Sequence, residues 1–246
     1  MIVVEGRVFL EKGLKTCCVG IEEGRIVAIK KVLKGDEHQD FGDDLVLPGC
    51  IDAHVHFREP GRTHKEDFNT GSMAAALGGV TCVLDMPNNQ PPVNDARSLA
   101  DKLELVKPKA NVDFGLYAAL VRREGLEALS ETVTGFKVYL ARNTDASGIA
   151  LGSSDLGALL PRASRKRPVS IHCEDEDLIK DIEEKDLEDH LAARPAAAET
   201  RAMEAVLGIA REAKCRAHIA HVSAGRASSC SKERGARPTP PLRPLR

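Results

Sequence analysis

Short apolar runs alternate with longer amphipathic stretches along most of the chain after residue 47. The apolar runs have the length of buried strands, and the stretches between them have the length and spacing of amphipathic helices. The expected strands lie at 49–54, 80–84, 112–116, 135–139, 168–172 and 217–221. The expected helices lie at 64–77, 95–106, 122–131, 154–166, 174–188 and 196–213. This alternation predicts an α/β fold, in which helical crossovers connect the strands of a parallel sheet.

The first 47 residues have a different pattern, because they contain short β-type runs separated by turns. Strands are expected at 3–4, 18–21 and 25–29, and Glu23-Gly24 is a turn signal between the last two. A piece of this size cannot hold a core alone. We therefore expect a small β-sandwich piece at 1–47 that needs strands or a domain from elsewhere to cover it.

The last residues, 226–246, differ from both of these segments. Proline, arginine and serine dominate there, and the prolines at 238, 240, 241 and 244 are incompatible with a helix interior or a central strand. The sequence thus predicts a main domain at 48–225 and an irregular tail at 226–246.

The composition excludes several classes of protein. A chain of 246 residues with 42% hydrophobic and 29% charged residues and a net charge of -2 has no basic excess for nucleic-acid binding. No apolar run approaches the roughly 20 residues that span a bilayer, and the N-terminus lacks a signal-peptide pattern, so we expect a cytoplasmic protein without a membrane partner. The 7 cysteines form no Cys-x-x-Cys pair and predict neither a disulfide framework nor a cysteine-type zinc site.

The position of the polar residues bears on how the sheet closes. An open doubly wound sheet binds ligands at one switch point, whereas a barrel collects them from the carboxyl ends of many strands. His56, Lys137, His172 and His221 lie at or near the ends of different apolar runs. This distribution favours a (β/α) TIM-type barrel.

The segment from Asp52 to Arg58 contains the first candidate metal ligands. Alternate residues of a strand point to one side, so Asp52, His54 and His56 share a face, and Arg58 follows the strand end. Two imidazoles about 7 Å apart along a strand can converge on one ion, for which zinc is the natural choice. Taken alone, His-x-His is more often incidental surface sequence.

Histidines at two other strand ends favour a metal site over incidental surface sequence. His172 closes one apolar run and His221 closes another. His218 is three residues before His221, so strand parity places the two on opposite faces, and we expect His221 to be the ligand and His218 a structural residue.

Lys137 lies between apolar neighbours, where a lysine is unfavourable unless it is neutralised or paired. One interpretation is a strand-end lysine that reaches solvent. The other interpretation applies beside a metal centre, where a neutral lysine amine can react with carbon dioxide to give a carbamate able to bridge two ions.

With these residues, the chain resembles the dihydroorotases of the amidohydrolase superfamily. The resemblance rests on Pro48-Gly-Cys-Ile-Asp-Ala-His-Val-His-Phe-Arg-Glu-Pro-Gly61, Thr63-His-Lys-Glu-Asp67, Asp85-Met-Pro-Asn-Asn-Gln-Pro-Pro92, Gly135-Phe-Lys-Val-Tyr139, Ile171-His-Cys-Glu174 and His221-Val-Ser223. It implies a barrel with two zinc ions. The implied ligands are His54 and His56 on one ion, His172 and His221 on the other, and carboxylated Lys137 between them, while Arg58 and Asn88 hold a substrate carboxylate.

The resemblance also implies an activity, the reversible cyclisation of N-carbamoyl-L-aspartate to L-dihydroorotate in de novo pyrimidine (UMP) biosynthesis. The implied partners are a second copy of the chain or aspartate carbamoyltransferase. The family's catalytic aspartate follows the eighth strand, and we find about six of the eight βα units of a barrel. The change of composition after Ser223 therefore predicts a truncated or frameshifted chain of doubtful activity, with a linker or partner-binding tail as the other interpretation.

Two other functions fit the same residues. Allantoinases and hydantoinases share the metal set, but Arg58 beside Asn88 favours a substrate with a carboxylate. Outside this context, Arg58 would form a surface ion pair with Glu59 or Glu66, and Asn88 would be a turn residue. A non-catalytic relative that scaffolds a partner enzyme is the alternative from another class.

Overall fold

The computed structural model describes residues 1–141 and 148–225, so the tail predicted at 226–246 lies outside the described residues. The chain divides into two compact units between Cys50 and Ile51, and each unit is described by itself. In neither described range is any helix both long and apolar enough to cross a membrane.

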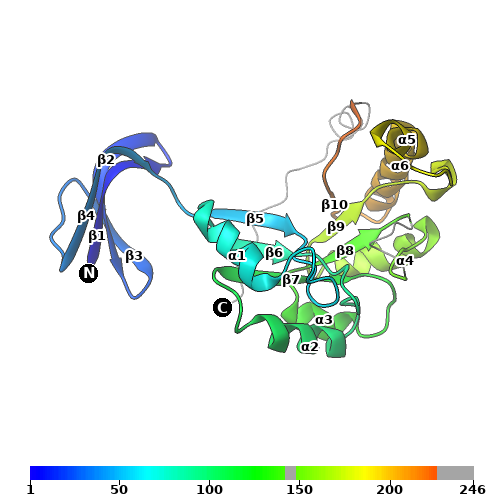
Figure 1. Ribbon diagram of the computed structural model, residues 1–246, viewed down its shortest axis with the longest axis horizontal. Coiled ribbons are helices and arrows are strands. Elements are labelled where there is room, and N and C mark those ends of the chain that lie inside the picture. The colour runs from blue at the N-terminus through cyan, green and yellow to red at the C-terminus, as the bar shows by residue number, and fades with distance from the viewer. Residues whose placement is uncertain (142–147, 226–246) are drawn as a thin grey trace. The chain divides into compact units, whose positions relative to one another are not determined.

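The first unit is a four-stranded sheet in the order β3-β2-β1-β4 (Figure 1). Its strands are β1 (Ile2–Leu10), β2 (Gly13–Glu22), β3 (Arg25–Lys30) and β4 (Glu37–Val46). Strands β1, β2 and β3 pair antiparallel, and β4 pairs parallel to β1. The predicted turn is present, because Glu23 and Gly24 both have positive φ. Strand β4 was not predicted, since its residues are mostly polar and it is an exposed edge strand.

The second unit contains a six-stranded sheet in the order β10-β9-β8-β7-β6-β5 (Figure 1). Its strands are β5 (Cys50–Val55), β6 (Val80–Asp85), β7 (Asp113–Ala119), β8 (Gly135–Tyr139), β9 (Val169–His172) and β10 (His218–Ile219). Strands β6 to β10 pair parallel with their sequence neighbours. The predicted α/β class is therefore confirmed, and this curled sheet fits part of a (β/α) barrel.

Helices connect these strands (Figure 1). They are α1 (Phe68–Leu77), α2 (Ala96–Val106), α3 (Leu126–Thr132), α4 (Ser153–Ala163), α5 (Leu187–Ala193) and α6 (Ala196–Glu212). Asp67 and Asp95 begin α1 and α2, because each side chain accepts a hydrogen bond from a backbone N–H of the first turn. At α2 the bond is reciprocated, because the backbone N–H of Asp95 donates to the Ser98 hydroxyl.

The helix predicted at 174–188 is wrong. Only a 3₁₀ turn, η1 (Glu176–Leu178), forms near its start, and α5 begins at Leu187. The carboxylates of Glu174 and Asp175 bind arginines from later elements, and Lys180 N–H donates to the Ala193 carbonyl instead of to a helical turn. These contacts hold the acidic segment against the following helices in a non-helical conformation.

Phe68 anchors α1 to the sheet. Its side chain is fully buried, and its ring packs edge to face against Phe57 at 5.1 Å and Phe114 at 5.5 Å between ring centroids. Phe57 lies two residues after the end of β5, so this aromatic cluster fixes the path of the chain just beyond that strand.

We predict that Phe68→Ala lowers the free energy of unfolding by about 3–5 kcal/mol, because it removes a buried ring and leaves a cavity. Leu77→Ala, on the same helix at a position that is 86% exposed, is the matched control and should change it by no more than about 0.5 kcal/mol. Urea unfolding measures both. Similar losses for the two variants would contradict the anchoring role.

Candidate metal centre

Four strands bring the predicted metal-binding residues together at one edge of the sheet. His54 lies on β5 and His56 follows it, Lys137 lies on β8, His172 ends β9, and His221 follows β10. Ring centroids are 5.2 Å apart for His54 and His56, 5.2 Å for His54 and His221, and 4.9 Å for His172 and His221. Carboxyl ends of parallel strands meet at the same edge, which is why residues so distant in sequence cluster here.

All of these side chains except His54 border a cavity of about 390 Å³, a volume that suits a small ligand. Its lining includes His56, Arg58, Asn88, Lys137, His172 and His221. The described structure therefore places both predicted substrate-binding residues beside the histidine cluster.

His221, rather than His218, lies in this cluster. His218 pairs with Ser170 in the sheet and is not among the described residues that line the cavity. The backbone of His221 has a φ of 38°, which is strained for a residue other than glycine. Strained residues of this kind cluster at active sites and ligand-binding sites.

Asn88 orients His56. The Nδ1–H of His56 donates to the Asn88 Oδ1 at 2.7 Å, which leaves Nε2 as the nitrogen with a free lone pair. Asn88 is 6% exposed, so its carbonyl is committed to the histidine and its amide nitrogen is the group that can donate to a ligand.

Glu174 orients His172 in the same way. The Nε2–H of His172 donates to Glu174 Oε2 at 2.8 Å, and Arg194 donates to that oxygen at 2.6 Å. The other ring nitrogen of His172, Nδ1, lies within hydrogen-bond distance of Nε2 of His221, at 3.3 Å. Two nitrogen ligands of a tetrahedral zinc lie about 3.3 Å apart, given Zn–N bonds of about 2.0–2.1 Å, so these two nitrogens are already spaced as a ligand pair.

The environment of His54, His56 and His221 favours their neutral form. Burial, then the charge of Lys137, lowers the pKa of His54 to about 3, and the same two causes lower the pKa of His221 to about 4. Burial also lowers the pKa of His56. Neutral imidazole is the form that binds metal, so the cluster is ready to bind at neutral pH.

Lys137 tests whether the cluster fits metal ions and a carbamate. Its side chain is 1% exposed, and its Nζ has no hydrogen-bond partner among the described residues. Burial lowers the pKa of the amine to about 8. The solvent-facing interpretation of this lysine is therefore wrong, and a buried amine that is easily neutralised fits a lysine able to form a carbamate and share metal ions.

Two loops that carry Arg58 and Asn88 pack tightly against each other. Arg58 has a φ of 59° and Gly61 a φ of 96°. A Cβ at Gly61 would lie 2.3 Å from the Gln90 carbonyl oxygen, so only glycine permits this approach. The contact holds the guanidinium-bearing loop beside the asparagine-bearing loop.

A second buried lysine, Lys102, connects the same two loops through hydrogen bonds. Lys102 is 1% exposed and donates to Asp85 and, at 2.6 Å, to Asn89 Oδ1. Asp85 also accepts a hydrogen bond from the backbone N–H of Phe57 at 2.8 Å. One ion pair thus links the residue after His56 to the residue after Asn88. Sequence reasoning did not identify Lys102, because a lysine in an amphipathic helix is usually solvent-exposed.

Comparison with known proteins agrees with this geometry. Residues 45–237 match the model of the Amidohydrolase family, which is more than half of the chain. The chain belongs to the amidohydrolase family.

Its relatives carry several activities in their names. The chain is 36% identical to an allantoinase of Rubrobacter xylanophilus, over 95% of this chain and 55% of the relative. It is 39% identical to a dihydroorotase of Methanothermobacter thermautotrophicus, over 85% of this chain and 49% of the relative. The chain therefore spans about half the length of the curated relatives it matches.

Solved structures show the same fold. The L-hydantoinase of Arthrobacter aurescens superposes with a TM-score of 0.85 at 24% identity, covering 95% of this chain and 55% of that one. At this identity, the similarity establishes the architecture of the two units and leaves the substrate open.

The two buried lysines should respond in opposite ways to substitution in metal-free protein. Lys137→Met should raise the free energy of unfolding by about 1–3 kcal/mol, because it removes a buried amine that has no hydrogen-bond partner among the described residues. Lys102→Met should lower it by about 3–5 kcal/mol, because it leaves the Asp85 carboxylate buried and unpaired. Urea unfolding in the presence of a chelator measures both, and destabilisation by Lys137→Met would show that its amine is satisfied in the fold.

Proposed function

We propose that this chain carries the metal centre and the carboxylate-binding side chains of a dihydroorotase, which interconverts dihydroorotate and N-carbamoyl-aspartate. The observation that carries the proposal is the presence of Arg58 and Asn88 in the same cavity as His56, His172 and His221. Membership of the amidohydrolase family and the dihydroorotase names among its relatives support it.

The side chains fit two divalent ions, with zinc the best match to nitrogen and oxygen ligands. In this proposal, His54 and His56 would hold one ion, His172 and His221 would hold the other, and carboxylated Lys137 would be a ligand shared by both. Ions in this position supply Lewis-acid polarisation of an amide carbonyl and lower the pKa of water.

The chain's own residues would select and orient the substrate. The guanidinium of Arg58 suits bidentate binding of the substrate carboxylate, and the amide nitrogen of Asn88 can add a second donor. Glu174 and Asn88 fix the tautomers of His172 and His56, so that each ring presents one lone pair to the site. Burial raises the pKa of Cys173 to about 12, so the neighbouring thiol stays protonated and is no competing nucleophile.

The proton for the leaving nitrogen has no assigned donor here. We expected an aspartate after an eighth strand, and the sheet within the described residues has six strands. Three expectations stay predictions. They are the activity of the complete protein, its assembly as a homodimer or with aspartate carbamoyltransferase, and a cytoplasmic location.

An allantoinase is the second candidate, because a relative of that name is 36% identical over most of this chain. Allantoin carries no carboxylate, so Arg58 discriminates between the two. A non-catalytic scaffold is a third candidate and would bind metal without turnover.

We predict that the two neighbouring histidines differ in their effect on metal content. His221→Asn should reduce the zinc bound per chain, because it removes a ligand, whereas His218→Asn should leave it unchanged. Inductively coupled plasma mass spectrometry on the two purified variants measures this. Equal metal content in both variants would contradict the assignment of His221.

We further predict that Arg58→Met lowers the affinity for carbamoyl aspartate about 10- to 100-fold without loss of metal, because a charged hydrogen bond contributes about 1.5–3 kcal/mol. Arg97→Met, at a fully solvated position of α2, is the control. Calorimetric titration detects binding whether or not the chain turns over.

Activity assays with dihydroorotate, allantoin and hydantoin complete the test. Turnover of dihydroorotate supports the proposal, and turnover of allantoin alone overturns it. Binding of carbamoyl aspartate without any turnover would favour the scaffold.

A further inference from the structure

Three metal-binding side chains from three strands meet in the first unit, away from the histidine cluster in sequence. Glu5 on β1 lies directly opposite Cys18 on β2. His38 on β4 lies opposite Val3, which shares a face of β1 with Glu5. The strand register therefore places all three side chains on the same face of the sheet, although the sequence separates them widely.

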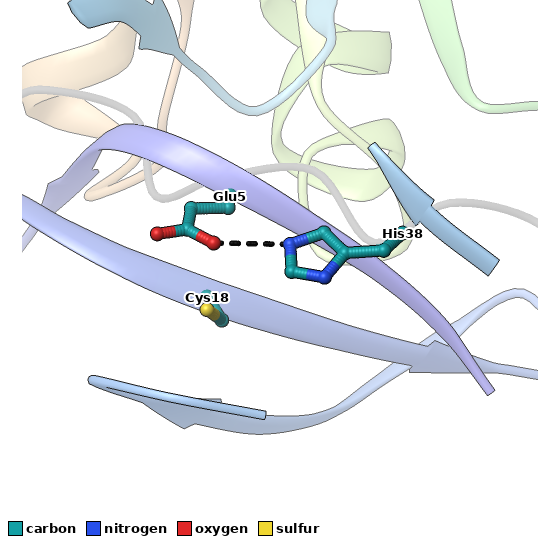
Figure 2. Close-up of side chains that lie close together, drawn as sticks. All are labelled: Glu5, Cys18 and His38. Atoms are coloured by element: carbon teal, nitrogen blue, oxygen red, sulfur yellow. Dashed lines mark hydrogen bonds and ion pairs between the residues drawn. The ribbon is translucent and has the colours of Figure 1, made fainter. Parts of the chain in front are cut away.

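Their ligand atoms are close enough to share one ion. The Nε2 of His38 lies 3.0 Å from Oε2 of Glu5, and these two atoms and the Cys18 sulfur all lie within 4.8 Å of one another. Figure 2 shows the carboxylate and the imidazole pointing toward each other, with the Cys18 sulfur beside them. Ligand atoms of a tetrahedral zinc are about 3.3–3.8 Å apart, so small side-chain rotations complete the geometry.

Burial is graded across the cluster. Cys18 is 1% exposed, whereas the side chains of Glu5 and His38 are 33% and 44% exposed. The sulfur thus forms the floor of the cluster, and the two exposed groups can rotate toward it. A fourth coordination position would face water.

We propose that Glu5, Cys18 and His38 form a second metal site, which takes zinc. Thiolate, imidazole and carboxylate are the three side-chain ligands that zinc accepts, and the mixture of soft and borderline donors excludes magnesium and calcium. The ion would link β1, β2 and β4 in a unit whose buried core is small, consisting of Val8, Cys17 and Val19 with few neighbours.

Without an ion, the same residues have an ordinary explanation. Glu5 and His38 form an ion pair at the surface, and the Cys18 thiol is a weak donor to the Lys31 carbonyl at 3.7 Å. Burial raises the pKa of the Cys18 thiol, so it is protonated when no cation is present. Zinc binding would displace this proton, and its affinity should therefore increase with pH.

Cobalt(II) separates this site from the histidine cluster, because only a thiolate ligand gives a sulfur-to-cobalt charge-transfer band in the near ultraviolet. The experiment titrates the full chain, freed of metal and kept reduced, with cobalt(II) alone. We expect the band to appear in the unmodified protein and to be lost when zinc is added. It should be absent from Cys18→Ser.

Two cysteine variants are matched controls. Cys17→Ser changes the adjacent buried thiol, which strand alternation places on the other face, and Cys173→Ser changes the thiol next to His172. Both should keep the band. His38→Ala alters an exposed side chain, so it carries little risk to folding. Loss of a residue that only orients a ligand weakens metal binding roughly 10- to 100-fold, and loss of the ligand His38 itself should weaken cobalt binding by more than this.

A band that persists in Cys18→Ser overturns the proposal, as does a band that is lost in Cys173→Ser instead. Absence of any charge-transfer band from the unmodified protein also overturns it. An unchanged affinity of His38→Ala for cobalt(II) also overturns it, because binding by the Cys18 thiolate alone would not depend on that imidazole.

Discussion

The amine of Lys137 is buried on a central strand of the parallel sheet and has no hydrogen-bond partner among the described residues, which is an unfavourable arrangement. The residues around it would fit a carbamate on this lysine together with metal ions. Neutral imidazoles of His54 and His221 lie close to its charge, and each has its pKa lowered partly by that charge. A carbamate on the lysine and cations between the histidines would replace a set of mutually unfavourable groups by complementary ones. The cluster therefore fits the metal centre that we propose.

Holding the ligands in place requires support outside the cluster. Asn88 and Glu174 each accept a hydrogen bond from the ring N–H of one histidine and so decide which nitrogen faces the site. The buried pair of Lys102 and Asp85 then ties the loop after β5 to the loop after β6. Removing one member of such a pair is costly, so these residues fix the site through the stability of the fold.

Much of this architecture could be predicted from the sequence, because the sheet strands of the second unit are apolar and bounded by clear turns. The clustering of the histidines could be predicted because His56, His172 and His221 lie at or just after the ends of those runs. Strand β4 could not, since its polar residues carry no strand pattern and pairing with β1 alone defines it. The helix expected at 174–188 failed because Glu174 and Asp175 bind arginines that lie far along the chain. Sequence order does not reveal such distant partners. For the same reason, neither the role of Lys102 nor the cluster of Glu5, Cys18 and His38 could be predicted.

The most direct test of the metal-centre account is a crystal structure of zinc-loaded protein with diffraction recorded on both sides of the zinc absorption edge. The account predicts anomalous density within bonding distance of His54, His56, His172 and His221, with electron density for a carboxyl group on the Nζ of Lys137. A zinc-loaded crystal without anomalous density at this cluster, or with an unmodified lysine hydrogen-bonded elsewhere, would contradict it.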